Sequence, residues 1–223
     1  MRLCLYLIKI TNMQFEKNAG RSLLISSILL VLTMVLHPAG GNIEHILKIK
    51  TLIIVTHSIA VLALPFCMIG FWGFTKKLGA EHFLSLPAFA ISVFGLIAAM
   101  GAAAVNGLAL PLFLERYKNA STEVIESIKP IIKYGSSLNH AFDYIFIGAM
   151  CLSILLWSIT VLKTKKATAW LGYFGIALTL LAIVLLATGF GFVNLYGFRL
   201  FVFGVAAWIV WVSFVLLKSE KNE

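Results

Sequence analysis

The stretch that decides the fold is Leu86–Phe113, LPAFAISVFGLIAAMGAAAVNGLALPLF, which contains no charged side chain. A helix needs roughly 20 predominantly apolar residues to cross the hydrocarbon core of a bilayer, so this stretch predicts a transmembrane helix. Pro87 falls in its first turn, where a proline costs little. The strands of a membrane β-barrel would instead alternate in polarity over about ten residues.

The rest of the chain has the same character. Of its 223 residues, 61% are hydrophobic and 12% are charged, and the mean hydropathy is +0.98. Soluble domains are nearer 45–50% apolar and about 25% charged. This composition excludes a soluble enzyme, a disordered chain, a disulfide scaffold and a nucleic-acid-binding module. We therefore predict an all-α, multi-pass membrane protein with membrane lipids as its surroundings.

Six apolar stretches are long enough to be considered as spans, and we expect them to form one transmembrane domain over residues 22–217. Residues 1–21 are predicted as a cytoplasmic N-terminal segment and residues 218–223 as a cytoplasmic tail. The expected spans are about Ser22–Leu36, Thr51–Thr75, Leu86–Phe113, Ala141–Leu162, Ala169–Leu195 and Phe198–Leu217.

Orientation follows from the basic residues. The net charge of +9 comes from Lys and Arg that sit mainly in short connections, where positive charge marks the cytoplasmic side. The short loops at Lys76-Lys77 and Lys163–Lys166 carry the most weight, and they place both termini in the cytoplasm. The longest connection, residues 114–139, then lies outside. Its apolar residues repeat at helical spacing, and Ser121 or Thr122 can cap a helix, so we predict a short helix on the outer membrane surface.

An internal repeat relates the second and third spans to the fourth and fifth. Thr56-His57 opens the second span as Asn139-His140 opens the fourth, and Val105-Asn106 and Val193-Asn194 lie near the outer ends of the third and fifth. Such a repeat would make these helices a pseudo-symmetric four-helix core, flanked by the first and sixth spans. It predicts that His57 faces His140 and that Asn106 faces Asn194.

Polar groups inside a bilayer are costly and mark functional positions. In this chain they gather towards the outer side. We predict an outward-facing polar pocket for a small ligand, formed by His57, Asn106, Asn139, His140, Asp143, Asn194 and Arg199. His140 and Asp143 share one helical face, so the carboxyl group is expected to set the charge state of the imidazole. Arg199 and His57 are further candidate partners for Asp143.

Other interpretations of the same residues remain open. His57, His140 and Asp143 could hold a zinc ion in a membrane hydrolase, although no HExxH motif is present. His57 and His140 could instead be the axial ligands of one haem. A structural subunit without any site is the fourth interpretation, in which these groups only cap helices. His37 and His45 are interpreted in that way, and Tyr196 and the tryptophans as anchors at the membrane interface.

Three short features carry a resemblance to a known family. They are the basic entry Lys17–Arg21, the HPAG turn at His37–Gly40, and the Trp170-Leu171-Gly172-Tyr173 stretch that follows a basic loop. In these the chain resembles small, uncharacterised bacterial six-span inner-membrane proteins. The resemblance implies a location in the bacterial inner membrane and no particular reaction.

Overall fold

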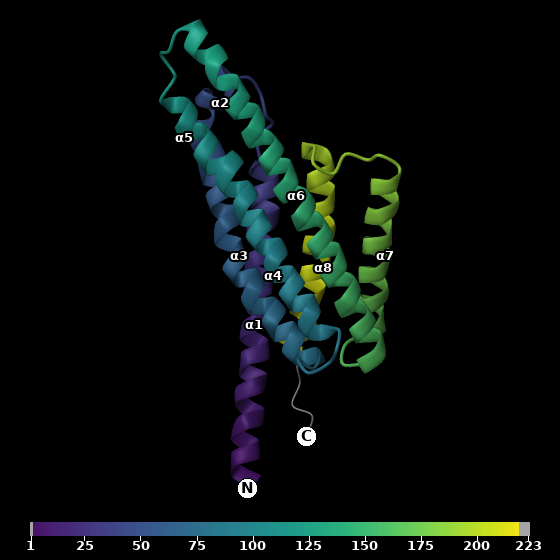
Figure 1. The fold of residues 1–223 in the computed structure, drawn as a ribbon. Coiled ribbons are helices and arrows are strands. Elements are labelled where there is room, and N and C mark those ends of the chain that lie inside the picture. Colours follow the sequence, from purple (N-terminus) through teal and green to yellow (C-terminus); the bar gives the residue numbers. More distant parts are fainter. Residues whose placement is uncertain (1, 219–223) are drawn as a thin grey trace.

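The fold is described from a computed structural model that covers residues 2–218, with side chains described from Met13 onward. Over this part of the chain the structure is helical and contains no strand. The elements are α1 (Arg2–Leu36), α2 (Ile43–Lys48), α3 (Lys50–Leu78), α4 (Ser85–Ala102), the π-helix η1 (Ala103–Ala109), α5 (Leu110–Glu115), α6 (Thr122–Thr164), α7 (Ala169–Ala187) and α8 (Leu195–Leu217). Figure 1 shows the long helices side by side in one elongated bundle.

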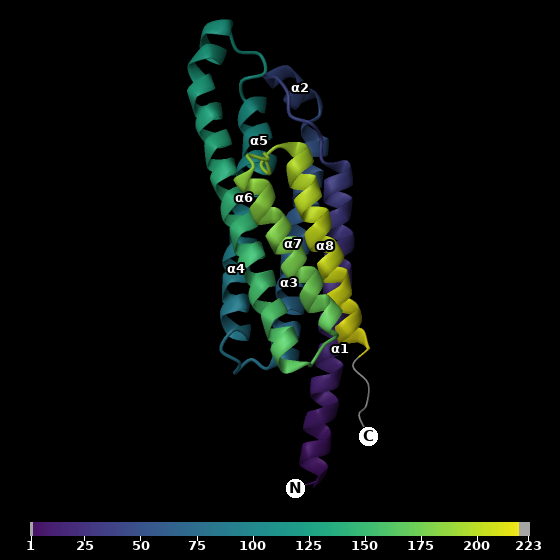
Figure 2. The same cartoon turned by 90° about the vertical axis from the view of Figure 1, so that its right-hand side faces the viewer.

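The prediction of six spans is confirmed within the described residues. Six helical stretches are long and apolar enough to cross a membrane: Met13–Leu36, Lys50–Leu78, Ser85–Glu115, Thr122–Thr164, Ala169–Ala187 and Leu195–Leu217. The N-terminal end of α1 and the C-terminal end of α8 lie at the same end of the bundle in both views (Figures 1 and 2). The predicted tail at 218–223 lies outside the described residues except for Lys218.

The first span begins earlier than expected. We predicted residues 1–21 as a segment preceding the bundle, but α1 is continuous from Arg2 and its apolar span begins at Met13. Its charged residues are accommodated by neighbours, since Glu16 forms a 2.9 Å ion pair with Lys77 of α3. Ser213 of α8 donates a 2.7 Å hydrogen bond to the Gly20 carbonyl. The helix therefore continues through these charged residues, and the cytoplasmic location of residues 1–21 stays a prediction.

The predicted surface helix is not a separate element. Residues 122–139 form the beginning of α6, a single helix of 43 residues that also contains the fourth span. Ser121 caps it as expected, accepting a hydrogen bond from the Val124 amide at 3.5 Å. Pro130 lies inside this helix without ending it. The first turns of α6 extend past the neighbouring spans (Figure 1).

The packing order differs from the predicted four-helix core. α1 packs against α3 and α8, α4 packs against α6, and α7 packs mainly against α6. The first and sixth spans therefore pack directly against each other and help to form the core, whereas α7 lies at the edge of the bundle (Figure 1). The two-helix repeat stays a prediction.

Small residues bring α4 and α6 close together, as predicted for helices that associate in lipid. A Cβ atom on Gly95 would lie 2.9 Å from the Cβ of Ala149 on α6. A Cβ on Gly101 would lie 3.0 Å from the ring of Phe142. Larger residues at these two positions would push the helices apart.

Two tryptophans form a buried aromatic cluster instead of anchoring the protein at the membrane interface. Trp157 and Trp208 are fully buried and stacked, with ring centroids 5.8 Å apart, and Phe74 packs against both. The indole Nε1 of Trp157 donates a hydrogen bond to Thr75 Oγ1 at 3.1 Å. The expectation of interface anchors was wrong for these two residues, because their neighbours cover them completely.

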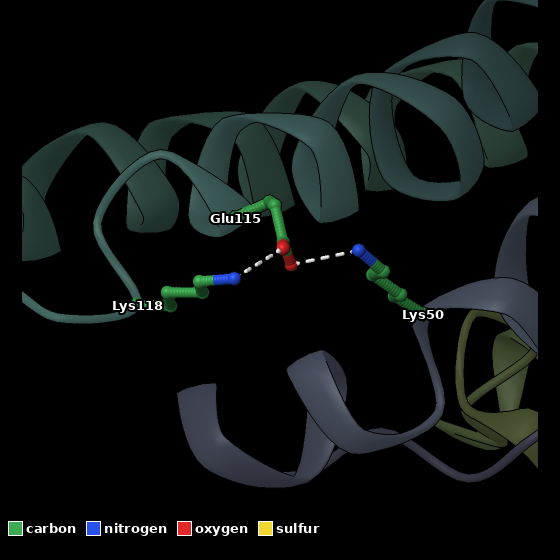
Figure 3. A network of polar contacts seen from close by, with 3 residues as sticks. All are labelled: Lys50, Glu115 and Lys118. Atoms are coloured by element: carbon green, nitrogen blue, oxygen red, sulfur yellow. Dashed lines mark hydrogen bonds and ion pairs between the residues drawn. The ribbon is translucent and has the colours of Figure 1, made fainter.

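A polar network ties α5 to the start of α3 at one end of the bundle. Glu115 lies between Lys50 at 2.9 Å and Lys118 at 3.1 Å (Figure 3). All three side chains are about one third exposed or more, so the pairs are of the kind that contribute little to stability. They hold the connection after α5 beside α3.

Candidate functional site

The interior of the bundle contains a cavity of about 260 Å³. Residues of α1, α3, α4, η1, α6 and α8 line it, together with the connections after α1 and before α8, and none of α7 does. Its polar lining residues are Thr33, His37, His57, Asn106, Asn139, His140 and Asp143. Five of the seven predicted site residues therefore meet at one cavity, drawn from three segments of the chain.

His57 is the most enclosed histidine of this group. It is only 7% exposed, and its Nδ1 lies 2.8 Å from the Ile53 carbonyl one turn earlier on α3. A carbonyl can only accept, so Nδ1 carries the proton and the neutral ring keeps a lone pair on Nε2. The backbone thus fixes both the tautomer and the direction of the ring.

The π-helix η1 supplies the space for this ring. A Cβ atom on Gly107 would lie 1.9 Å from Cγ of His57 and 2.3 Å from its Cβ, so only glycine fits there. The preceding residue, Asn106, lines the cavity. Short π-helical segments are frequent at functional sites, because the extra residue in the turn redirects side chains.

Asp143 is 8% exposed and lines the same cavity from α6. One of its carboxyl oxygens accepts a 2.8 Å hydrogen bond from Asn139 Nδ2, one turn earlier. Among the described side chains no salt bridge involves Asp143, so the expected pairing with His140, His57 or Arg199 was wrong. The side-chain amide of Asn139, four residues before Asp143, reaches the carboxyl group. His140 is instead an exposed side chain at the edge of the cavity.

His37 was interpreted from the sequence as a loop residue, yet it also lines the cavity. Its ring packs edge-to-face on that of His57, with centroids 4.9 Å apart and planes at 61°. Its Nδ1 lies 3.0 Å from the Pro38 carbonyl. Burial, with the nearby His57 as a further cause, lowers the pKa of His37 to about 4, so its imidazole is neutral at pH 7. The sequence did not predict this position, because His37 follows the end of α1 and precedes Pro38 and two glycines, as a loop residue would.

The remaining two predicted residues, Asn194 and Arg199, do not line the cavity. Asn194 is exposed and caps α8, accepting a 2.8 Å hydrogen bond from the Gly197 amide. Arg199 donates a 2.7 Å hydrogen bond to the His37 carbonyl and is not among the lining residues. Asn106 therefore does not face Asn194 across the cavity. Arg199 acts on the site indirectly, by holding the connection that carries His37.

The geometry does not assemble the metal set considered from the sequence. Among the described side chains, no three His, Cys, Asp or Glu residues lie close enough to hold a metal ion together. His57, His140 and Asp143 all line the cavity, but their side chains do not converge on one point. The ring that packs against His57 is that of His37. No such contact joins His57 and His140 among the described residues, so they do not form the facing pair considered as haem ligands.

The rest of the cavity wall is apolar. Along α3 it runs from His57 past Leu64 to Phe71, and along α8 it reaches Ile209. No family model, curated protein or solved structure matches the chain. What the arrangement can do follows from its chemistry alone: it can enclose a small molecule with hydrogen-bonding groups at one end.

Proposed function

We propose that this integral membrane protein binds a small ligand in the cavity, with its polar part at His57, Asn106, Asn139, His140 and Asp143. The observation that carries the proposal is the meeting of these side chains, from α3, η1 and α6, at one cavity whose other walls are apolar. Ligand sites have this form, with a few placed polar groups in a mainly hydrophobic pocket.

The setting of this function is part of the proposal. The basic loops favour cytoplasmic termini, which would open the polar end of the cavity to the outside. The resemblance noted in the sequence favours the bacterial inner membrane. Passage of the ligand across the membrane is not part of the proposal, because α3 is one unbroken helix although Pro65 lies inside it. Binding is therefore the activity that we propose to test.

The test is to fill the cavity and ask whether the protein still retains a ligand. Ala99 lines the cavity from α4, and Ala90 is an exposed alanine on the same helix, so Ala99→Phe and Ala90→Phe form a matched pair. Each protein is purified in mild detergent, and the small molecules that it retains are identified by mass spectrometry. We expect a molecule retained in stoichiometric amount by the wild type and by Ala90→Phe, and lost from Ala99→Phe. The same retained molecules in all three proteins would overturn the proposal.

A further inference from the structure

The cavity is elongated, and its two ends differ in chemistry. On α3 its lining extends from His57 to Phe71, which is about 20 Å along a helix axis. Histidine, asparagine and aspartate side chains lie at the His57 end, whereas Cys67, Phe71 and Ile209 line the other end. A molecule with a polar head and an apolar tail matches this division along its whole length.

The polar end offers hydrogen-bond acceptors. Because Nδ1 of His57 and Nδ1 of His37 each face a backbone carbonyl, both neutral rings keep Nε2 as an acceptor. Asn139 uses one amide hydrogen on Asp143, and its side-chain oxygen makes no hydrogen bond within the described residues. A head group that donates hydrogen bonds would therefore find acceptors at this end of the cavity.

The charge of the site points the same way. Asp143 is more than nine-tenths buried, and its only hydrogen-bonding partner among the described residues is the neutral Asn139. No Lys or Arg is among the described residues that line the cavity, and the neutral His37 adds no positive charge. Arg199 is the nearby cation; it lies outside the lining and donates a hydrogen bond to the His37 carbonyl. A buried carboxylate is costly unless a cation pairs with it. An anionic head group would be repelled here, and a cationic one would supply the missing partner.

From this geometry we infer that the ligand is an amphiphilic amine, whose ammonium group pairs with Asp143 and whose apolar tail extends towards Phe71. The inference rests on the proposed function and names the substrate class of the same site. Phe146, one turn after Asp143 on α6, also lines the cavity, and aromatic rings attract ammonium groups.

The head group, more than the tail, should decide which amphiphile binds. A tail that leaves the bilayer for the cavity exchanges one apolar environment for another, so it gains little. The hydrogen bonds of a charged head group are stronger than those of a neutral one. Amphiphiles with the same tail and different heads therefore separate the contributions.

The experiment compares dodecylamine, dodecanol and dodecanoic acid at pH 7. Binding of each radiolabelled probe is measured by equilibrium dialysis on full-length protein in phosphatidylcholine nanodiscs, with empty nanodiscs subtracted. We expect the amine to bind roughly tenfold to hundredfold more tightly than the alcohol, and the acid to bind least. Equal or tighter binding of the acid would overturn the inference.

The variants assign the preference to one carboxyl group. Asp143→Asn should remove the preference for the amine over the alcohol, and Asp143→Glu should keep part of that preference. Glu126→Gln removes an exposed acidic group from the same helix and should change nothing. A preference for the amine that survives Asp143→Asn would refute the role of Asp143.

Failure of the inference and failure of the proposed function are distinguishable. If no probe binds, the inference is refuted, and the retention test on Ala99→Phe then decides the proposed function separately. A native ligand lost on filling the cavity would keep the function while changing the ligand class. Identical retention by all variants would refute both.

Discussion

Replacing Gly107 with alanine should disturb the site more than any other change of one methyl group. The added Cβ would lie 1.9 Å from Cγ of His57, whereas carbon atoms in contact are about 3.5–4.0 Å apart. The ring or the η1 backbone must therefore move by about 1.6 Å or more. Because the Cβ of His57 is also only 2.3 Å away, rotation of the ring alone cannot relieve the clash.

The loss of stability caused by Gly107→Ala can be compared with that of a matched control, Gly148→Ala. Gly148 is an exposed glycine on α6, and a Cβ there would meet nothing within 4 Å. Both substitutions gain about the same 0.5–1 kcal/mol that a helix gains when alanine replaces glycine. Overpacking a tight contact costs typically 1–3 kcal/mol. Because the two gains cancel, the difference in unfolding free energy between Gly107→Ala and Gly148→Ala should be about 1–3 kcal/mol.

The assay is equilibrium unfolding in mixed micelles, followed by tryptophan fluorescence, to which the buried Trp157 and Trp208 contribute. Repeating Gly107→Ala in a His57→Gly background removes the clashing atoms, so its cost there should shrink to that of the control. The reasoning is refuted if Gly107→Ala is no less stable than Gly148→Ala, or if its cost is the same with and without the His57 side chain.

Three further predictions concern single polar groups. Asn139→Ala removes the donor to the buried Asp143 and should lower the unfolding free energy by about 1–3 kcal/mol in the same micelle titration. Thr75→Val leaves the buried indole N–H of Trp157 without an acceptor; we expect a similar loss, together with a changed tryptophan emission spectrum. The pKa of His37 is about 4 in the folded protein, so the unfolded chain binds a proton more readily. Stability contributed by neutral His37 should be complete above about pH 6.5 and be lost as the pH falls towards 4, and His37→Gln should flatten this part of the stability profile.

Each of these has an exposed counterpart as its control. Ser137→Ala, Thr188→Val and His45→Gln alter side chains of similar type outside the interior, and each should change the unfolding free energy by less than about 0.5 kcal/mol. Equal losses in a variant and its counterpart would show that burial of the named group is not the cause. An unchanged pH profile in His37→Gln would contradict the assignment of that slope to His37.

Hydropathy was sufficient to predict the fold class, because lipid requires the backbone of a spanning segment to satisfy its own hydrogen bonds. It was less informative about where helices begin and end. Glu16, Lys17 and Arg21 suggested an entry segment, but α1 continues through them, and a salt bridge to Lys77 accommodates Glu16. The apolar repeat and the cap at Ser121 suggested a separate surface helix, but this helix continues without a break, through Pro130, into the fourth span as α6.

The candidate site could be predicted only where a polar residue lies inside an apolar stretch. His57, Asn106 and Asp143 stand out for that reason, and each lines the cavity. His37 and Gly107 could not be found in this way. The first lies in a turn, and the second matters only because the η1 backbone brings it against His57. Asn194 is polar in the same type of position and serves as a helix cap, a difference that residue type alone does not reveal.

The cavity itself has a cause in the sequence of α4 and η1, where three of the lining residues are the small Ala99, Ala102 and Ala103. If the 260 Å³ were enclosed and empty, it would cost at most about 6 kcal/mol at roughly 24 cal/mol per Å³. This loss of folding free energy is offset when a ligand occupies the cavity. For the same reason, a side chain that fills the cavity should stabilise the ligand-free protein. Ala99→Phe buries a large apolar side chain worth about 1.5–3 kcal/mol, so ligand-stripped Ala99→Phe should unfold at a higher temperature than stripped wild type. Ala90→Phe, which faces outward, should show no such gain. If Ala99→Phe were instead less stable than the stripped wild type, the alanines would be there to let helices approach, and the space beside them would be no binding site.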